Sequence, residues 1–415
     1  MLYLNPRASR VPYPADLQNI MSMTRASESR GWLTQWDGLR AGNTPLRDLP
    51  DLAASLGVRR VLMKDEALRS SLGSFKALGA PIALVRQILR TFEGSGFSAK
   101  TLFAGAHRDA LAGFTAISAT DGNHGRALAA AAQRIGCPCV IVLHAHVSEE
   151  REQAIAAYGA RIVRIAGNYD ASVTEAAALA ERHGWHVISD TSYDGYEAIP
   201  RDVMQGYGTI AAEVVEALAT AGGDGAHAAH ATAAPLTHVF VQGGVGGLAA
   251  GVVSYLWECW GALRPAFVVV EPVQADCLFQ SAIAGKPAQA TGTVDSVMAG
   301  LACGETSPLA WRFLQTSVDG FMTVTDGQAV DAMRRLAQGS ENDVPFVAGE
   351  SGVAGLAGLT AAATSPAMAS ALGLNADSRV LLINTEGATA PSVYAELVGE
   401  TAEAVAERQR AWLSR

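Results

Sequence analysis

The chain has 415 residues, of which 49% are hydrophobic and 17% are charged, and its formal net charge is −9 at pH 7. This length suffices for about two or three domains and for a large buried core. The negative charge and the absence of Lys- and Arg-rich runs argue against nucleic acid as a partner. The 42 glycines exceed the usual share, which indicates tight turns or backbone that approaches a ligand closely.

The cysteines do not fit a secreted disulfide framework, because their number is odd and the chain is long. The five are Cys137, Cys139, Cys259, Cys277 and Cys303. We therefore expect reduced, mostly buried thiols in a cytoplasmic protein. A pair between Cys277 and Cys303 stays open, because both lie beside motifs described below.

The first ten residues, MLYLNPRASR, lack the charged and then apolar pattern of a signal peptide. Residues 239–257 are long and apolar enough to resemble a membrane span. Gln242 and a cluster of glycines interrupt them, which favours a strand, a glycine turn and a buried helix. We therefore expect no membrane partner.

Residues 71–80, SLGSFKALGA, place Lys76 among small and apolar residues. Lysine is usually a surface residue. In one interpretation the stem of Lys76 is buried and its amine reaches water. In the other, the amine is used chemically, most often as a Schiff base. The stretch alone does not decide between them.

Short β-rich runs then alternate with helical patterns. Strands are predicted at 115–119, 138–144, 161–166 and 186–190, and helices between them at 125–136, 149–159 and 169–184. This alternation is typical of βαβ units, which form a parallel sheet with right-handed crossovers.

A polar turn, SATDGNHGR (118–126), follows the first of these strands. It lies at the C-terminal edge of the predicted sheet, where ligands bind in parallel α/β folds. Asp121 and Asn123 could be ordinary turn and helix-capping residues. That interpretation does not explain His124 with Gly125.

Residues 220–235, TAGGDGAHAAHATAAP, show no periodicity. Their histidines could suggest a metal tract. No acidic or cysteine partner stands at ligand spacing, so we expect a flexible surface loop and no metal.

A glycine loop, GGVGGLAAG (243–251), follows another predicted strand and begins a helix. Its backbone N–H groups and the helix N-terminus form an anion site. The spacing G-x-G-x-x-A, with Glu271 about 20 residues on, matches the dinucleotide fingerprint of a nicotinamide- or flavin-dependent oxidoreductase. Pro272 and the density of glycines instead favour a cup for one phosphate monoester.

Further buried strands are predicted at 237–242, 267–272 and 379–384. The fold class is therefore α/β, with two three-layer α/β/α domains and mostly parallel sheets. We expect a small α/β domain at 115–207 and a large domain assembled from 1–114 and 208–415.

The order of three features, a lysine in F-K-x-x-G, a strand followed by G-N-H-G, and a strand followed by a glycine cup, resembles fold type II pyridoxal-phosphate enzymes, the tryptophan synthase beta-like family. Further stretches are similar to the members of that family that act on 2,3-diaminopropionate: DTSYDGY (190–196), MQGYGT (204–209), EPVQADC (271–277), MAGLACGE (298–305), GESG (349–352) and NTEGAT (384–389). The similarity runs from about residue 43 to the last strand. Gly73 and Ser74 instead look like a serine/threonine dehydratase.

This resemblance implies a set of cofactor-binding residues. Lys76 would hold pyridoxal 5'-phosphate covalently, Asn123 would donate a hydrogen bond to the phenolic oxygen of the ring, and Thr385 would meet the pyridine nitrogen. The phosphate would be cradled by Gly243, Gly244, Val245, Gly246 and Gly247. A neutral hydroxyl at Thr385 does not require a protonated ring, which suits β-elimination.

The resemblance also implies a carbon–nitrogen lyase that converts 2,3-diaminopropionate to pyruvate and two ammonia. Such an elimination needs a base at the α-carbon, and the β-ammonium group needs a carboxylate nearby. We expect Asp121 and Asp190 to flank the α-carbon from opposite faces, so that the D- and L-substrates both react. The α-carboxylate would be bound by Thr120 and by the amides around Gly122 and Asn123.

A serine/threonine dehydratase on the same fold is the alternative. A neutral β-hydroxyl needs no carboxylate beside it, so Asp121 argues against this alternative. The expected partner is a small amino acid substrate, and the resemblance implies a homodimer.

Overall fold

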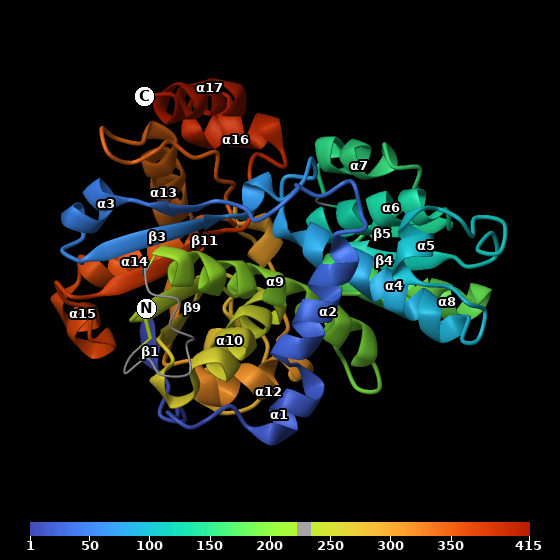
Figure 1. Cartoon of the computed structure of the whole chain (residues 1–415), viewed down its shortest axis with the longest axis horizontal. Helices are drawn as coiled ribbons and strands as arrows, with labels where there is room; N and C mark the ends of the chain where they lie inside the picture. The colour runs from blue at the N-terminus through green and yellow to red at the C-terminus, as the bar shows by residue number, and fades with distance from the viewer. Residues whose placement is uncertain (121, 146, 222–233) are drawn as a thin grey trace.

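The computed structural model describes residues 1–120, 122–145, 147–221 and 234–415. Helices cover both faces of two sheets that lie side by side (Figure 1). We call the larger sheet with its helices the large lobe, and the smaller sheet with α6, α7 and α8 the small lobe. The expected α/β architecture with mostly parallel sheets is confirmed.

The larger sheet is parallel except at its two edges. In the described part of the chain its order is Leu2–Leu4 (β1), Gly320–Val324 (β10), Ala266–Pro272 (β9), His238–Gln242 (β8), Arg379–Asn384 (β11), Arg60–Asp65 (β3) and Leu46–Asp48 (β2). The edge strands β1 and β2 pair antiparallel with their neighbours, and the other pairs are parallel.

Successive residues of the inner strands enter two separate cores. In β8, Val239 and Val241 pack in one core and Phe240 packs in the other. This is the pattern of a parallel sheet that is buried on both faces. On one face pack α9, α10 and α12, and on the other α13 and α14 (Figure 1).

The helices of the large lobe are Ala15–Ile20 (α1), Met23–Leu33 (α2), Pro50–Ser55 (α3), Ala198–Ala221 (α9), Gly247–Trp260 (α10), Cys277–Ala284 (α11), Pro308–Ser317 (α12), Asp326–Gln338 (α13), Ala354–Ala363 (α14), Pro366–Leu372 (α15), Pro391–Val398 (α16) and Ala402–Leu413 (α17).

The smaller sheet is entirely parallel. In the described residues its order is Arg161–Arg164 (β6), Cys139–Leu143 (β5), Ala116–Thr120 (β4) and His186–Val187 (β7). The helices of the small lobe are Asn123–Ile135 (α6), Glu149–Ala156 (α7) and Tyr169–His183 (α8). Helix α6 covers one face of the sheet and α8 covers the other.

Two helices that precede the small lobe in sequence lie against it. Ala80–Thr91 (α4) packs between α6 and α9, and Ala99–Phe103 (α5) packs on α6. The domain limits at 115 and 207 stay a prediction, and the predicted loop at 220–235 lies largely outside the described residues.

The strand predicted at 186–190 is shorter than expected. The Ile188 N–H still donates to the Ile117 carbonyl of β4 at 2.8 Å. After Ile188 the chain leaves the sheet, because the Ser189 N–H donates to the Tyr196 hydroxyl at 2.9 Å instead of to a neighbouring strand. This turn brings Asp190 out of the sheet and into the space between the lobes.

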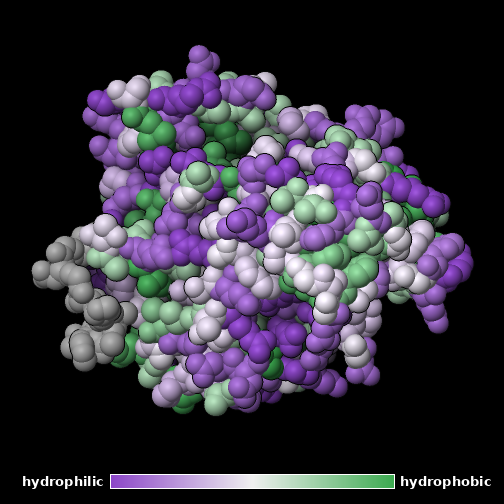
Figure 2. Space-filling view, turned by 45° about the vertical axis from the view of Figure 1, so that its right-hand side comes forward, coloured by the Kyte–Doolittle hydropathy of each residue, from purple (hydrophilic) through white to green (hydrophobic). Residues whose placement is uncertain are grey.

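On the face seen in Figure 2, hydrophilic and hydrophobic residues are interspersed. Large hydrophobic side chains that are exposed, such as Leu68, Leu263 and Ile283, are scattered through the sequence. Among the described residues, no helix combines the length and the apolar character needed to cross a membrane.

Candidate active site

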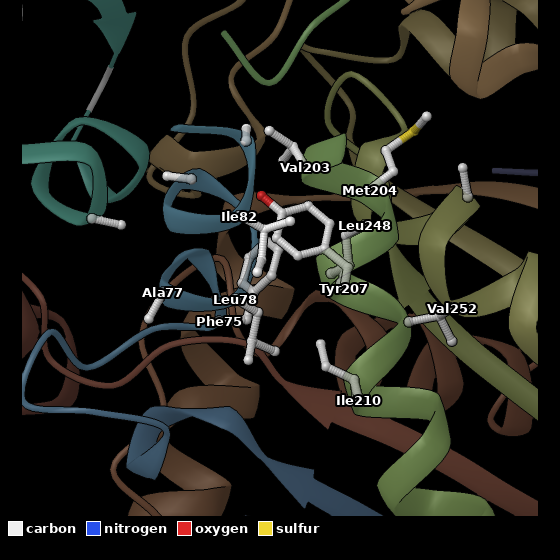
Figure 3. Packing of buried hydrophobic residues seen from close by; sticks show 14 of the residues in the cluster. Phe75, Ala77, Leu78, Ile82, Val203, Met204, Tyr207, Ile210, Leu248 and Val252 are labelled. Atoms are coloured by element: carbon white, nitrogen blue, oxygen red, sulfur yellow. The ribbon is translucent and has the colours of Figure 1, made fainter. Parts of the chain in front are cut away.

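Lys76 lies on a short 3-10 helix, Phe75–Leu78 (η2), that leads into α4. Its neighbours Phe75, Ala77 and Leu78 are buried. The Phe75 ring packs on the Tyr207 ring of α9 with the ring centroids 4.7 Å apart (Figure 3). The apolar residues of this stretch therefore anchor the turn in the core, and the Lys76 side chain is directed to the cavity between the lobes.

The Lys76 amine donates a hydrogen bond to Asp190 Oδ2 across the two lobes. The side chains are only 18% and 11% exposed. Burial raises the pKa of Asp190, but the positive charge of the Lys76 amine and its hydrogen bond outweigh this effect and hold that pKa well below its usual range. Asp190 is therefore ionised at neutral pH beside the amine.

His124 supports this pair from α6. Its Nε2 donates to the Ile188 carbonyl at 2.8 Å, which turns Nδ1 toward Asp190 Oδ2 at 3.8 Å. The ring therefore holds the chain just before Asp190 in place as well as facing its carboxylate.

The turn after β4 is closed by Thr120. Its hydroxyl oxygen accepts hydrogen bonds from the N–H groups of Gly122 at 3.0 Å and Gly125 at 3.2 Å. Gly122 has a φ of +156°, which side chains rarely adopt. Asp121 lies outside the described residues. The binding of a substrate carboxylate by Thr120 and Gly122 stays a prediction.

Asn123 is held from the large lobe. It begins α6, and its side-chain amide donates to Glu386 Oε2. The other oxygen of Glu386 accepts the N–H of Ser351 at 3.0 Å. An amide has two N–H donors, and the second is not used by any hydrogen bond to the described residues, so it can serve a ligand.

The glycine loop, residues 243–247, joins β8 to α10. Gly244 and Gly246 have φ values of +64° and +101°, which only glycine adopts without strain. The Gly243 N–H donates to the Val270 carbonyl and the Gly246 N–H donates to the Gly243 carbonyl. The amides of the other three loop residues, at the N-terminus of α10, are thus the best placed to bind an anion.

Thr385 follows the last residue of β11 and is buried, with 3% exposure. Its carbonyl accepts the Phe75 N–H at 3.0 Å, so it lies beside the lysine turn. One cavity is lined by the predicted residues Lys76, Thr120, Asn123, Asp190, Gly243, Gly244, Val245, Gly247 and Thr385. Gly246 is not in this lining; its place is in the loop itself.

Glu271 has a structural role that excludes the dinucleotide interpretation. It is fully buried, and its carboxylate accepts the N–H groups of Leu278 at 2.9 Å and Phe279 at 2.8 Å, in the first turn of α11. A Cβ on Gly243 would collide with the Glu271 side chain. Glu271 therefore packs under the glycine loop, and no ribose can reach it.

The Glu271 carboxyl also makes a pH-dependent contribution to stability. Burial raises its pKa from 4.5 to about 8. A carboxyl whose pKa is raised by folding stabilises the fold fully below its unfolded pKa, and that contribution is lost as the pH rises through the folded value. Between pH 4.5 and 8 we expect the free energy of unfolding to fall by several kcal/mol, at most about 5.

Urea unfolding of Glu271→Gln at pH 5 and pH 8 tests this expectation. The difference between the two pH values should shrink in Glu271→Gln and persist in Glu403→Gln, because Glu403 is exposed. An unchanged pH difference in Glu271→Gln would contradict the raised pKa.

The five cysteines are free thiols. Cys277 donates to the Gly244 carbonyl at 3.4 Å, and burial raises its pKa well above the usual value. The pair with Cys303 that the sequence left open is not formed in this structure.

The site fits pyridoxal phosphate. Lys76 provides an amine, and Thr385 and Asn123 provide a hydroxyl and an amide. The glycine loop provides backbone N–H groups at the N-terminus of α10. A Cβ on Gly246 would lie 3.0 Å from the Ala310 side chain, which is a tight contact. These groups match an aldehyde, a phosphate, a ring nitrogen and a phenolic oxygen in chemical type.

A cleft of about 660 Å³ adjoins the cavity. Tyr169, Val245 and Cys303 line both. Sequence reasoning did not assign roles to Tyr169, Tyr207 or Arg151. Tyr207 lies in the MQGYGT stretch, and the resemblance of this stretch to the family was the feature of the sequence that could have pointed to Tyr207.

Comparisons with known proteins agree with this geometry. The family model for pyridoxal-phosphate dependent enzymes matches residues 39–386. The diaminopropionate ammonia-lyase of Escherichia coli (strain K12) is 37% identical over 391 residues, which cover 93% of this chain and 94% of that protein. The diaminopropionate ammonia-lyase of Salmonella typhimurium is 36% identical over 364 residues, 86% of this chain and 87% of that protein.

A crystal structure of the holo diaminopropionate ammonia-lyase from Escherichia coli superimposes with a TM-score of 0.84 and 35% sequence identity, and the match covers 96% of each chain.

Proposed function

The chain belongs to the family of pyridoxal-phosphate dependent enzymes, and from this premise we propose that it is a carbon–nitrogen lyase that converts 2,3-diaminopropionate and water to pyruvate and two ammonia. The similarity to diaminopropionate ammonia-lyases over nearly the whole chain supports this substrate. The observation that carries the proposal is Asp190, an ionised carboxylate held against the Lys76 amine at the glycine-loop cavity.

Pyridoxal phosphate, when bound, supplies the electron sink that stabilises negative charge at the α-carbon of an amino acid. Lys76 would hold it, Gly244, Val245 and Gly247 would bind its phosphate, and Thr385 and Asn123 would contact its ring.

The residues of this chain would then move the protons. Asp190 is in the ionised form, which is the form that accepts a proton. We assign it the α-proton of one substrate enantiomer and assign Asp121 that of the other. Lys76 would deliver a proton to the departing β-amine, because its amine lies within hydrogen-bond reach of Asp190.

Substrate specificity follows from charge. The β-ammonium group of the diamine is disfavoured in a buried cavity unless a carboxylate faces it. Asp190 provides such a carboxylate. Serine and threonine carry no charge at this position and gain nothing from it.

We further propose that the protein is a cytoplasmic homodimer. The resemblance to the family supports the dimer, and five free thiols support a reducing compartment. Sedimentation equilibrium of the purified protein tests the dimer, and a mass of one chain would exclude it.

The function is tested by pyruvate release with added pyridoxal phosphate, using D- and L-2,3-diaminopropionate, serine and threonine in parallel. We expect kcat/KM for the diamine to exceed that for the hydroxy amino acids by at least about 100-fold, as a buried charge partner allows. Turnover of serine or threonine alone would replace the proposal by the dehydratase alternative.

A further inference from the structure

The first turn of α7 reaches from the small lobe to the large lobe. Arg151 Nη2 donates to Glu350 Oε1 at 2.6 Å, and the adjacent Glu150 accepts the Ser392 hydroxyl of α16 at 2.7 Å. The first of these contacts is buried, since the Arg151 side chain is 17% exposed and that of Glu350 only 2%. Consecutive residues of one helix therefore join the lobes at two points.

The stem of Arg151 covers Gly122 between β4 and α6; we call the described residues Thr120, Gly122 and Asn123 the turn. The Arg151 Cδ lies 3.4 Å from the position that a Cβ on Gly122 would take. A side chain at Gly122 would press on this arginine, so the bare backbone of the turn and the arginine stem pack directly on each other.

The same turn is tied to the same part of the large lobe by a second route. Asn123 donates to Glu386, and Glu386 accepts the N–H of Ser351, which is the residue after Glu350. Arg151 and Asn123 thus fix the turn to one large-lobe platform, which consists of residues 349–352 and 384–387.

Arg151 favours the ionised form of Glu350. Glu350 is buried, and both burial and the nearby Glu386 charge raise its pKa, to about 7, while Arg151 opposes this rise. Without Arg151, Glu350 would lose the ion pair that it makes in the described part of the chain, while Glu386 would stay nearby. The docked position of α7 is therefore the arrangement in which the platform is electrostatically satisfied.

We propose that Arg151 is a positioning residue: by pairing with Glu350, it holds Gly122 and Asn123 against the platform, so that the backbone there is in place to bind the carboxylate of the substrate. This inference rests on the proposed function for its substrate. Arg151 acts through the turn and does not itself take part in proton transfer.

Kinetics separate this role from a general loss of stability. We expect Arg151→Gln to raise KM for diaminopropionate about tenfold and to change kcat by less than about twofold, because ground-state binding is what the turn supplies. Arg151→Lys should recover part of the loss, since it keeps the charge without the guanidinium geometry. Arg312→Gln is the matched control, because Arg312 makes an ion pair of the same length, 2.6 Å, with Glu197 on the surface.

A double-mutant cycle tests the pair itself. Glu350→Gln should raise KM as Arg151→Gln does, and the double variant should be no worse than either single variant. Effects that multiply to about 100-fold would show that the two residues act independently and would overturn the proposal.

Hydrogen–deuterium exchange of the cofactor-free protein tests the positioning role of Arg151 without any substrate. Arg151→Gln should raise exchange at the amides of residues 122–126 and 149–156, with the cores of both sheets unchanged. Unchanged exchange at these amides would overturn the proposal even if the enzyme were active. Failure of the wild-type protein to release pyruvate, with exchange altered as expected, would instead overturn the proposed function alone.

Discussion

Replacing Lys76 with alanine is expected to reduce pyruvate release from diaminopropionate by at least about 1,000-fold and to abolish retention of pyridoxal phosphate through gel filtration. The amine is the group that would hold the cofactor and deliver a proton. Its removal also leaves Asp190 buried without its cation, which raises the pKa of that carboxyl. Activity and bound cofactor, measured by absorbance, check both effects.

Lys100→Ala is the control for this experiment, because Lys100 is exposed on α5 and away from the cavity. It should retain full activity and full cofactor. If Lys76→Ala retained both the activity and the cofactor, Lys76 would have no chemical role. The alternative from the sequence would then hold, in which its stem is buried and its amine reaches water.

Replacing Asp190 with asparagine should lower kcat/KM for one enantiomer of diaminopropionate by about 100- to 10,000-fold and affect the other much less. The amide keeps the size of the side chain and removes its ability to accept a proton. Asp121→Asn should give the opposite preference. Initial rates with separate D- and L-substrates measure both.

Asp194→Asn is the matched control for Asp190→Asn, because Asp194 lies four residues away and is exposed. Equal decreases in kcat/KM for both enantiomers in Asp190→Asn would contradict the assignment of the two carboxylates to opposite faces of the α-carbon. In that case Asp190 would serve chiefly to orient Lys76.

Much of the fold could be predicted from the sequence, because the signals were local. The alternation of buried runs and helical patterns places β4, β5, β8, β9 and β11 close to their observed limits. Each of these strands is buried along most of its length, so its composition alone marks it. The edge strands β1 and β2 have three residues each and carry no such pattern.

The segments predicted to bind the cofactor could also be recognised in the sequence. Lys76 and the glycine loop are each marked by unusual neighbours, and their order along the chain points to the family. What the sequence left open was Glu271, whose spacing suits a ribose-binding acid. Only the tertiary structure shows that Glu271 supports the glycine loop, because it is buried under Gly243 and accepts hydrogen bonds from α11.

The sequence by itself determined the α/β class and predicted a reactive lysine and a phosphate loop, because hydrophobic period and glycine spacing act within a few residues. The tertiary structure alone decided the partners: Lys76 with Asp190 across 114 residues, Arg151 with Glu350 across 199, and Asn123 with Glu386 across 263. Such pairs depend on how the two lobes pack, and no local pattern of residues specifies which distant charge a side chain will face.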